Sequence, residues 1–125
     1  MPQMIKIIAG NVQIEAELND SPTAKSIIDA LPIEVSAQRW GGEIYFSIPV
    51  EAVIEEDSRD LLDAGELAFW PPGKAFCIFF GQTPASQGDE IRAASEVNII
   101  GKMKSDWSGL WDVPDSSRIV IKTIE

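Results

Sequence analysis

The amino-acid sequence contains no histidine and only one cysteine. Without an imidazole, the chain cannot form a Ser-His-Asp or Cys-His catalytic group, a histidine-ligated zinc site or a histidine acid–base pair. Without a second cysteine it cannot form an internal disulfide. Cys77 lies inside an apolar run, where a buried and unreactive thiol is expected. These absences exclude many of the common enzyme mechanisms.

Basic residues are also scarce, 10 against 20 acidic ones, which gives a net charge of -10. Such a surface repels phosphate backbones, so we expect no nucleic-acid partner. Residues 51–66 carry seven acids and Arg59 as the one basic residue. This segment lacks the Asp-x-Asp-x-Asp-Gly spacing of a calcium loop. We therefore predict a solvated connection there, and no metal site or cofactor.

No apolar run approaches the roughly 20 residues that span a bilayer. The amino-terminal MPQMIKIIAG has one lysine and a short apolar stretch, which favours a first strand over a signal peptide. We expect one cytoplasmic domain over residues 1–125, with no membrane partner. The oligomeric state is left open.

What the sequence does contain is a series of short segments with alternating apolar residues, typical of antiparallel strands. One helix is predicted over about 22–31, because Ser21 can cap it, Pro22 suits its first position and Pro32 ends it. The other segments predict mainly β structure: strands at 4–8, 12–18, 33–40, 43–49, 66–70, 74–80, 96–103 and 118–125, with a helical turn at 105–111. About eight strands and one helix favour a closed or nearly closed barrel.

The most apolar stretch is ELAFWPPGKAFCIFFGQ, residues 66–82. It predicts a hairpin, with a type II turn at Pro71-Pro72-Gly73. In its second strand, Phe76, Ile78 and Phe80 share one face, and Cys77 and Phe79 share the other. Two apolar faces indicate either a strand covered on both sides or one whose second face lines a cleft.

The segments SPTAKSIIDALP, NIIGKM and RIVIKTIE, in this order, resemble the cyclophilins. More closely, WGGEIYF, GELAFWPPGKAFCIFFGQTP and VNIIGKM are similar to a small, largely uncharacterised prokaryotic family of cyclophilin-like proteins. The resemblance covers nearly the whole chain. It implies a closed eight-stranded β-barrel with a surface cleft.

Cyclophilins isomerise the peptide bond before proline, and an arginine near the proline nitrogen promotes the loss of amide resonance. Such catalysis needs no titrating group, so the absence of histidine does not exclude it. The family's Phe-His-Arg strand and Gln-Gly-Gly-Asp stretch do not occur here. Arg39, in QRWGGE, is the one arginine in a comparable region and a weak catalytic candidate.

The leading hypothesis is a non-enzymatic binding module that holds a small molecule or peptide in an aromatic-lined cleft. Its candidate ligand-binding residues are Arg39, Trp40, Glu43, Tyr45, Phe79 and Gln82. The plainer alternatives are that Arg39 bonds Glu43 or a backbone carbonyl and that Tyr45 faces solvent. Two other functions stay open: a diverged peptidyl-prolyl isomerase that uses Arg39, and a subunit-interaction protein that uses Trp107 and Trp111.

Overall fold

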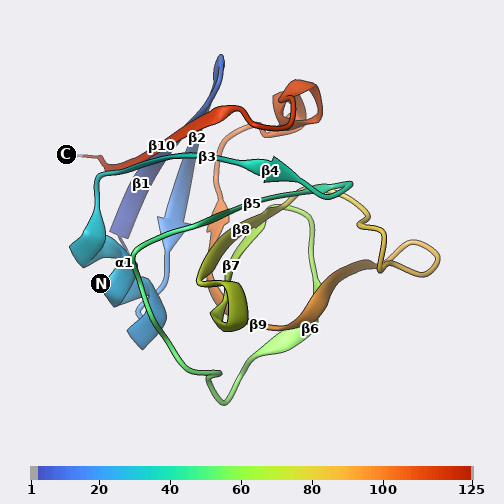
Figure 1. The fold of residues 1–125 in the computed structure, drawn as a ribbon, viewed down its shortest axis with the longest axis horizontal. Helices are drawn as coiled ribbons and strands as arrows, with labels where there is room; N and C mark the ends of the chain where they lie inside the picture. The colour runs from blue at the N-terminus through green and yellow to red at the C-terminus, as the bar shows by residue number, and fades with distance from the viewer. Residues whose placement is uncertain (1–2, 125) are drawn as a thin grey trace.

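The computed structural model describes residues 3–124, which are mainly β structure with one α-helix and two 3-10 turns (Figure 1). The strands are β1 (Gln3–Ala9), β2 (Val12–Leu18), β3 (Ile33–Ser36), β4 (Gln38–Arg39), β5 (Glu43–Ser47), β6 (Arg59–Leu62), β7 (Glu66–Trp70), β8 (Ala75–Phe79), β9 (Ile91–Met103) and β10 (Arg118–Thr123). The helical elements are α1 (Pro22–Ala30), η1 (Pro71–Gly73) and η2 (Ser108–Asp112).

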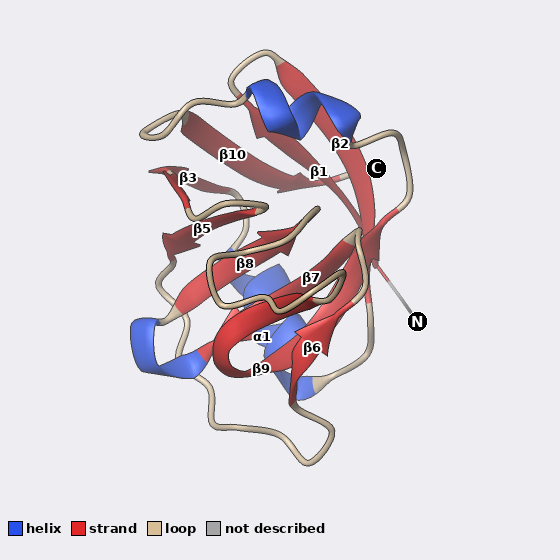
Figure 2. Ribbon diagram, turned by 90° about the vertical axis from the view of Figure 1, so that its right-hand side faces the viewer, coloured by secondary structure: helices blue, strands red, loops and turns tan. Residues whose placement is uncertain are grey.

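The strands form one antiparallel sheet in the order β3-β10-β1-β2-β9-β7-β8-β5-β4, and β6 pairs with β9. The sheet curls around its own inner face (Figure 2). Its two end strands, β3 and β4, follow one another in the chain, and no pairing between them is found in residues 3–124. The expected closed barrel of eight strands is therefore seen as a curled sheet of ten strands, with closure not detected.

The main hydrophobic core lies inside this curled sheet, because alternate residues of each strand point inward. Ile7, for example, pairs with Ile14 on β2 and Ile121 on β10, and all three are buried. The elements α1 and η2 lie at opposite ends of the curled sheet (Figures 1 and 2). No helix among the described residues has the length and hydropathy that a membrane crossing requires.

The predicted helix is confirmed, with its end one residue earlier than expected, at Ala30. The Ser21 hydroxyl accepts a hydrogen bond from the Ala24 backbone N–H at 3.2 Å, as an N-cap residue does. The predicted 66–80 hairpin is also present, but its turn is a 3-10 turn with the positive φ at Lys74 rather than at Gly73.

All five residues of β8 are buried, because its two faces are both covered. Phe76 and Ile78 point into the main core, while Cys77 and Phe79 belong to a second cluster on the outer side of the sheet. We call this second group the outer cluster. Its buried members are Leu62, Ala68, Ala75, Cys77, Phe79, Ile91, Ala93 and Val97.

Strand β9 supplies the cover for the outer face of β8. It is 13 residues long and bends (Figure 2), and its register with β7 shifts between Leu67 and Ala68. Its carboxyl half pairs with β2 and β7, whereas its amino half pairs with β6. The sequence predicted a strand only from residue 96, so the first five residues of β9 were missed.

The segment before β6 is attached to the core by the fully buried side chain of Asn98. Its amide group donates to the Val53 carbonyl at 2.8 Å and to the Thr23 hydroxyl at 3.0 Å. Its amide oxygen accepts from the Glu55 backbone N–H at 2.8 Å. The acidic segment 51–66 is therefore more than the solvated connection predicted: it is tied to α1 and includes β6.

We predict that Asn98→Ala lowers the free energy of unfolding by about 2–4 kcal/mol, because it removes one buried and two partly buried hydrogen bonds. Urea unfolding followed by circular dichroism measures this. The matched control is Asn11→Ala, in the exposed turn after β1, which should change stability by less than about 0.5 kcal/mol. Equal effects of the two substitutions would contradict this role of Asn98.

Candidate functional site

The turn Gly41–Gly42 places Trp40 and Glu43 at the two ends of a tight hairpin between β4 and β5. Trp40 N–H donates to the Glu43 carbonyl at 2.9 Å, and Glu43 N–H donates to the Trp40 carbonyl at 3.2 Å. A side chain on Gly42 would meet the Gly81 backbone at 2.2 Å. The two chains therefore pack backbone against backbone here, which requires glycine at position 42.

From this turn, β5 alternates between the two sides of the sheet. Ile44 and Phe46 are in the main core, while Glu43 and Tyr45 point to the outer side. On the neighbouring strand, Phe79 lies opposite Glu43 and Cys77 lies opposite Tyr45. The carboxyl group is thus positioned over the outer, apolar face of β8.

A pocket of about 160 Å³ opens on this outer face, and we call it the Glu43 pocket. It lies between β5 and β8 on one side and the amino half of β9 on the other. Its lining residues are Trp40, Glu43, Tyr45, Trp70, Ala75, Cys77, Ala93, Ala94 and Val97. The set combines three large rings with three alanines, and the small alanine side chains leave space beside the rings.

Trp70 bridges the two sides of this region. Its indole N–H donates to the Ser95 hydroxyl of β9 at 2.6 Å, and its ring lies 2.8 Å from where a side chain on Gly73 would begin. Trp40, Tyr45 and Trp70 are all half-buried. Each ring therefore combines packing against protein with a surface open to the pocket or to solvent.

Glu43 is the one charged residue that lines the pocket, and only 6% of its surface is exposed. Burial raises the pKa of Glu43 from 4.5 to about 7, although the neighbouring polar Cys77 thiol partly opposes this rise. Burial also raises the pKa of the Cys77 thiol well above its ordinary value, and the nearby Glu43 charge adds to the effect. The pocket thus holds one carboxyl that titrates near neutral pH and one protonated thiol.

The Arg39 side chain lies outside the Glu43 pocket and is used in the fold. Its guanidinium donates to the Val113 carbonyl at 2.7 Å and to the Gly41 carbonyl at 3.0 Å. It also lies over the rings of Phe80 and Trp111, at 5.2 and 5.9 Å from their centroids. Of the two alternatives for Arg39, the bond to backbone carbonyls is observed, and it attaches η2 to the β4–β5 hairpin.

Two other candidates are separated from the pocket. Phe79 has no exposed surface and packs within the outer cluster. Gln82 is exposed, and its amide donates to the Gly88 carbonyl. Of the six candidates, the structure brings together Trp40, Glu43 and Tyr45.

The two remaining tryptophans lie near η2. Trp107 packs against the main core and over Gly65, where a side chain would meet its ring at 2.8 Å. Trp111 is 52% exposed and packs edge-on against Phe80, with ring centroids 4.8 Å apart.

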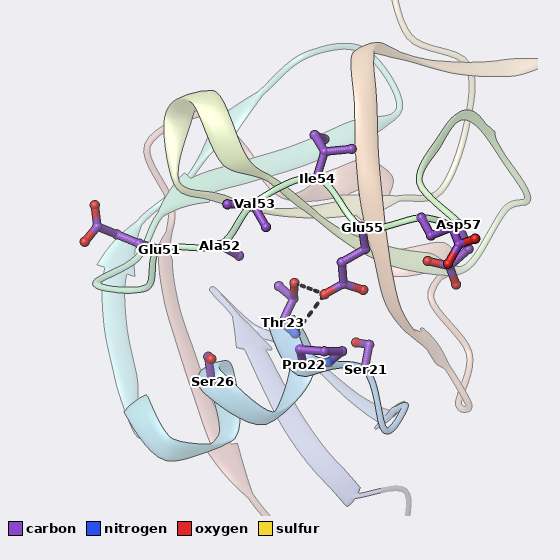
Figure 3. A pocket seen from close by; sticks show the side chains of 11 residues that line it. Ser21, Pro22, Thr23, Ser26, Glu51, Ala52, Val53, Ile54, Glu55 and Asp57 are labelled. Carbon is purple, nitrogen blue, oxygen red and sulfur yellow. Dashed lines mark hydrogen bonds between the residues drawn. The ribbon is translucent and has the colours of Figure 1, made fainter.

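A second and larger pocket, of about 790 Å³, lies between the start of α1 and the 51–57 segment (Figure 3). The Glu55 carboxylate in this pocket is bonded within the protein. It accepts hydrogen bonds from the Thr23 backbone N–H at 3.0 Å and from the Thr23 hydroxyl. The Glu55 carboxylate thereby satisfies an N–H at the amino end of α1, which stabilises the helix. Despite the many acids of this segment, residues 3–124 contain no group of three or more His, Cys, Asp or Glu side chains arranged to hold a metal.

Sequence reasoning did not find the part of the Glu43 pocket contributed by β9. Ala93, Ala94 and Val97 carry no chemical signal, and the first two precede the strand that the sequence predicted. The sequence signal for a cleft on this side was the second apolar face of β8, which contains Cys77 and Phe79.

The raised pKa of Glu43 predicts a stability difference between the wild type and Glu43→Gln that depends on pH. The folded state holds the Glu43 proton up to about pH 7, whereas the unfolded chain releases it near 4.5. Wild-type stability should therefore fall, relative to the variant, as pH rises from 4.5 to 7, by roughly 3 kcal/mol in total, and the difference should stay constant above that range. Urea unfolding at several pH values measures this.

The same titration can be observed directly. The ¹³C shift of the Glu43 carboxyl, assigned by its loss in Glu43→Gln, should change with a midpoint near pH 7. The control is Glu15→Gln on β2, which makes the same chemical change at an exposed position. A Glu43 midpoint at or below about 4.5 would show that the carboxyl is solvated.

Comparison with known proteins identifies the family to which this chain belongs. Residues 3–122 match the family described as Cyclophilin-like. Among solved structures, the chain is similar to the solution structure of the hypothetical protein AF2241 from Archaeoglobus fulgidus, with a TM-score of 0.85 and 41% sequence identity over 98% of this chain and 95% of that one. No curated protein matches. The predicted family is confirmed: this chain belongs to the cyclophilin-like family.

Proposed function

We propose that this protein is a binding module that holds a small molecule in the Glu43 pocket. The observation that carries the proposal is a concave, largely apolar pocket with one buried carboxyl group directed into it. Ligand sites combine an apolar lining with a few placed polar groups, and groups with shifted pKa values concentrate at such sites. The rings of Trp40, Tyr45 and Trp70 would make this site the aromatic-lined cleft expected from the sequence.

The pocket's size limits the ligand. A cavity of about 150 Å³ holds one benzene molecule, so a pocket of about 160 Å³ suits one small ring or a short branched chain. A peptide would fit only by inserting one side chain. A free small molecule therefore agrees with the pocket better than a peptide does.

The alternative, a diverged peptidyl-prolyl isomerase, has less support. It requires a cation beside the bound proline, and Arg39 has its guanidinium bonded to the Val113 and Gly41 carbonyls. The Glu43 pocket contains no basic side chain that could replace it. Two-dimensional exchange NMR on a short Xaa-Pro peptide tests this alternative, and faster cis–trans exchange in the presence of the protein would support it.

We predict that Ala94→Phe blocks binding while leaving the fold intact. Ala94 is exposed and lines the pocket, so a phenyl ring there covers the opening without entering the core. A small-fragment library screened by ¹H–¹⁵N NMR should give hits that saturate and that shift the amides of Ala93 and Val97. The affinity of these hits should fall at least about tenfold in Ala94→Phe, the factor that about 1.4 kcal/mol represents.

The matched control is Ala64→Phe, in the exposed turn before β7, which should bind the same fragments as the wild type. Saturable hits that keep their affinity in Ala94→Phe would place binding elsewhere. A library without a saturable hit at the pocket would argue against a small-molecule function for it.

A further inference from the structure

The Glu43 pocket holds a carboxyl group for which residues 3–124 provide no cationic partner. Its lining contains one carboxyl and no lysine or arginine. The ion pairs found among residues 3–124 do not include Glu43, although each of the arginines Arg59, Arg92 and Arg118 pairs with a carboxylate elsewhere. The Cys77 thiol is the polar side chain beside the Glu43 carboxyl, and it donates to the Ala75 carbonyl of its own strand at 3.7 Å. When ionised, this carboxylate is 94% buried and lacks a cation.

A buried carboxylate without a counter-ion is costly, and an opposite charge brought into contact removes much of that cost. The group best suited to contact this carboxylate is a cation that donates hydrogen bonds. The protein's net charge of -10 also favours the approach of a cation over that of an anion.

The aromatic lining indicates the same class of ligand. Trp40, Tyr45 and Trp70 contribute three π systems to a lining of nine residues, and the other residues apart from Glu43 are alanine, valine and cysteine. The face of an indole or phenol ring attracts an organic cation, most strongly where water is excluded. An aromatic lining with one carboxylate fits a charged nitrogen attached to a small apolar body.

We propose that the ligand of the Glu43 pocket is a compact organic cation, an ammonium group on an apolar body of about the size of a benzene ring. This inference rests on the binding function proposed above and names the chemical class of its ligand. The ammonium group would pair with Glu43, and the apolar body would lie against the rings and the alanines of β9.

The proposal implies that binding depends on the protonation of Glu43. The other titratable groups that face it are Tyr45 on its own strand and Cys77 on β8, whereas Trp70 of β7 and the alanines and valine of β9 do not titrate. Burial keeps the Cys77 thiol protonated. Affinity for the cation should therefore be highest above the pKa of Glu43, about 7, and fall up to about tenfold per pH unit below it.

The test compares benzylammonium with benzyl alcohol, two probes of nearly the same shape of which one is charged. Affinities are measured from ¹H–¹⁵N NMR shifts of the pocket amides at about pH 8 and about pH 5. We expect benzylammonium to bind at least about tenfold more tightly than the alcohol at the higher pH and to lose this advantage at the lower pH. This comparison uses the wild-type protein alone.

Glu43→Gln tests the same point by removing the charge while keeping the shape. It should reduce benzylammonium affinity at about pH 8 at least about tenfold and leave benzyl alcohol affinity nearly unchanged. Glu15→Gln, an exposed substitution with the same change of net charge, should affect neither probe.

The possible outcomes distinguish failure of the cation assignment from failure of the proposed small-molecule binding function. If benzyl alcohol binds in the pocket as tightly as benzylammonium, the pocket is a binding site but the cation assignment is wrong. If neither probe binds, the assignment is also wrong, while the fragment screen decides the binding function independently. If benzylammonium binds equally at both pH values, Glu43 is not its partner.

Discussion

The arrangement of this protein depends on one strand that cannot face water on either side. Strand β8 places Phe76 and Ile78 on its inner face and Cys77 and Phe79 on its outer face, and all four are buried. The curl of the sheet covers the inner face, but the outer face needs a second layer, since exposing the Phe79 ring would cost about 2–3 kcal/mol. The bent amino half of β9, together with β6, provides that layer. The Glu43 pocket lies where this cover is incomplete.

The elements that the sequence predicted are those whose signals are local. The helix cap at Ser21, the alternation of β2 and the aromatic hairpin each depend on residues close together in the chain, and each is found. The early start of β9 was missed because its pairing with β6 joins residues about 30 positions apart and its small side chains carry no strong β preference. Closure of the barrel was inferred from the number of strands and from the family resemblance, neither of which reports whether the end strands β3 and β4 pair.

The candidate site also contains residues whose position follows from local sequence and residues whose contacts depend on distant parts of the chain. Trp40, Glu43 and Tyr45 come together because a glycine turn and strict alternation, both readable in the sequence, position them. The bond from Arg39 to Val113 could not be predicted from the sequence, since the two residues are 74 positions apart. Phe79 was assigned correctly to the outer face, but the sequence does not reveal that β9 covers it. Local pattern thus predicts which way a side chain points better than what lies against it.

A carboxyl group kept at this position is costly for the folded protein. An apolar side chain at position 43 would pack against Cys77 and Phe79 without desolvating a charge. Such groups are typical of functional sites, where binding rather than stability determines the residue.

Two adjacent residues of β9 connect the two sides of the molecule. Val97 lines the Glu43 pocket, while Asn98, on the opposite face, holds the Glu55 segment and the start of α1. One peptide unit joins these two residues, so a backbone shift that accommodates a substitution at one position also moves the other. The effects of substitutions at these two positions on stability and on binding should therefore not be additive.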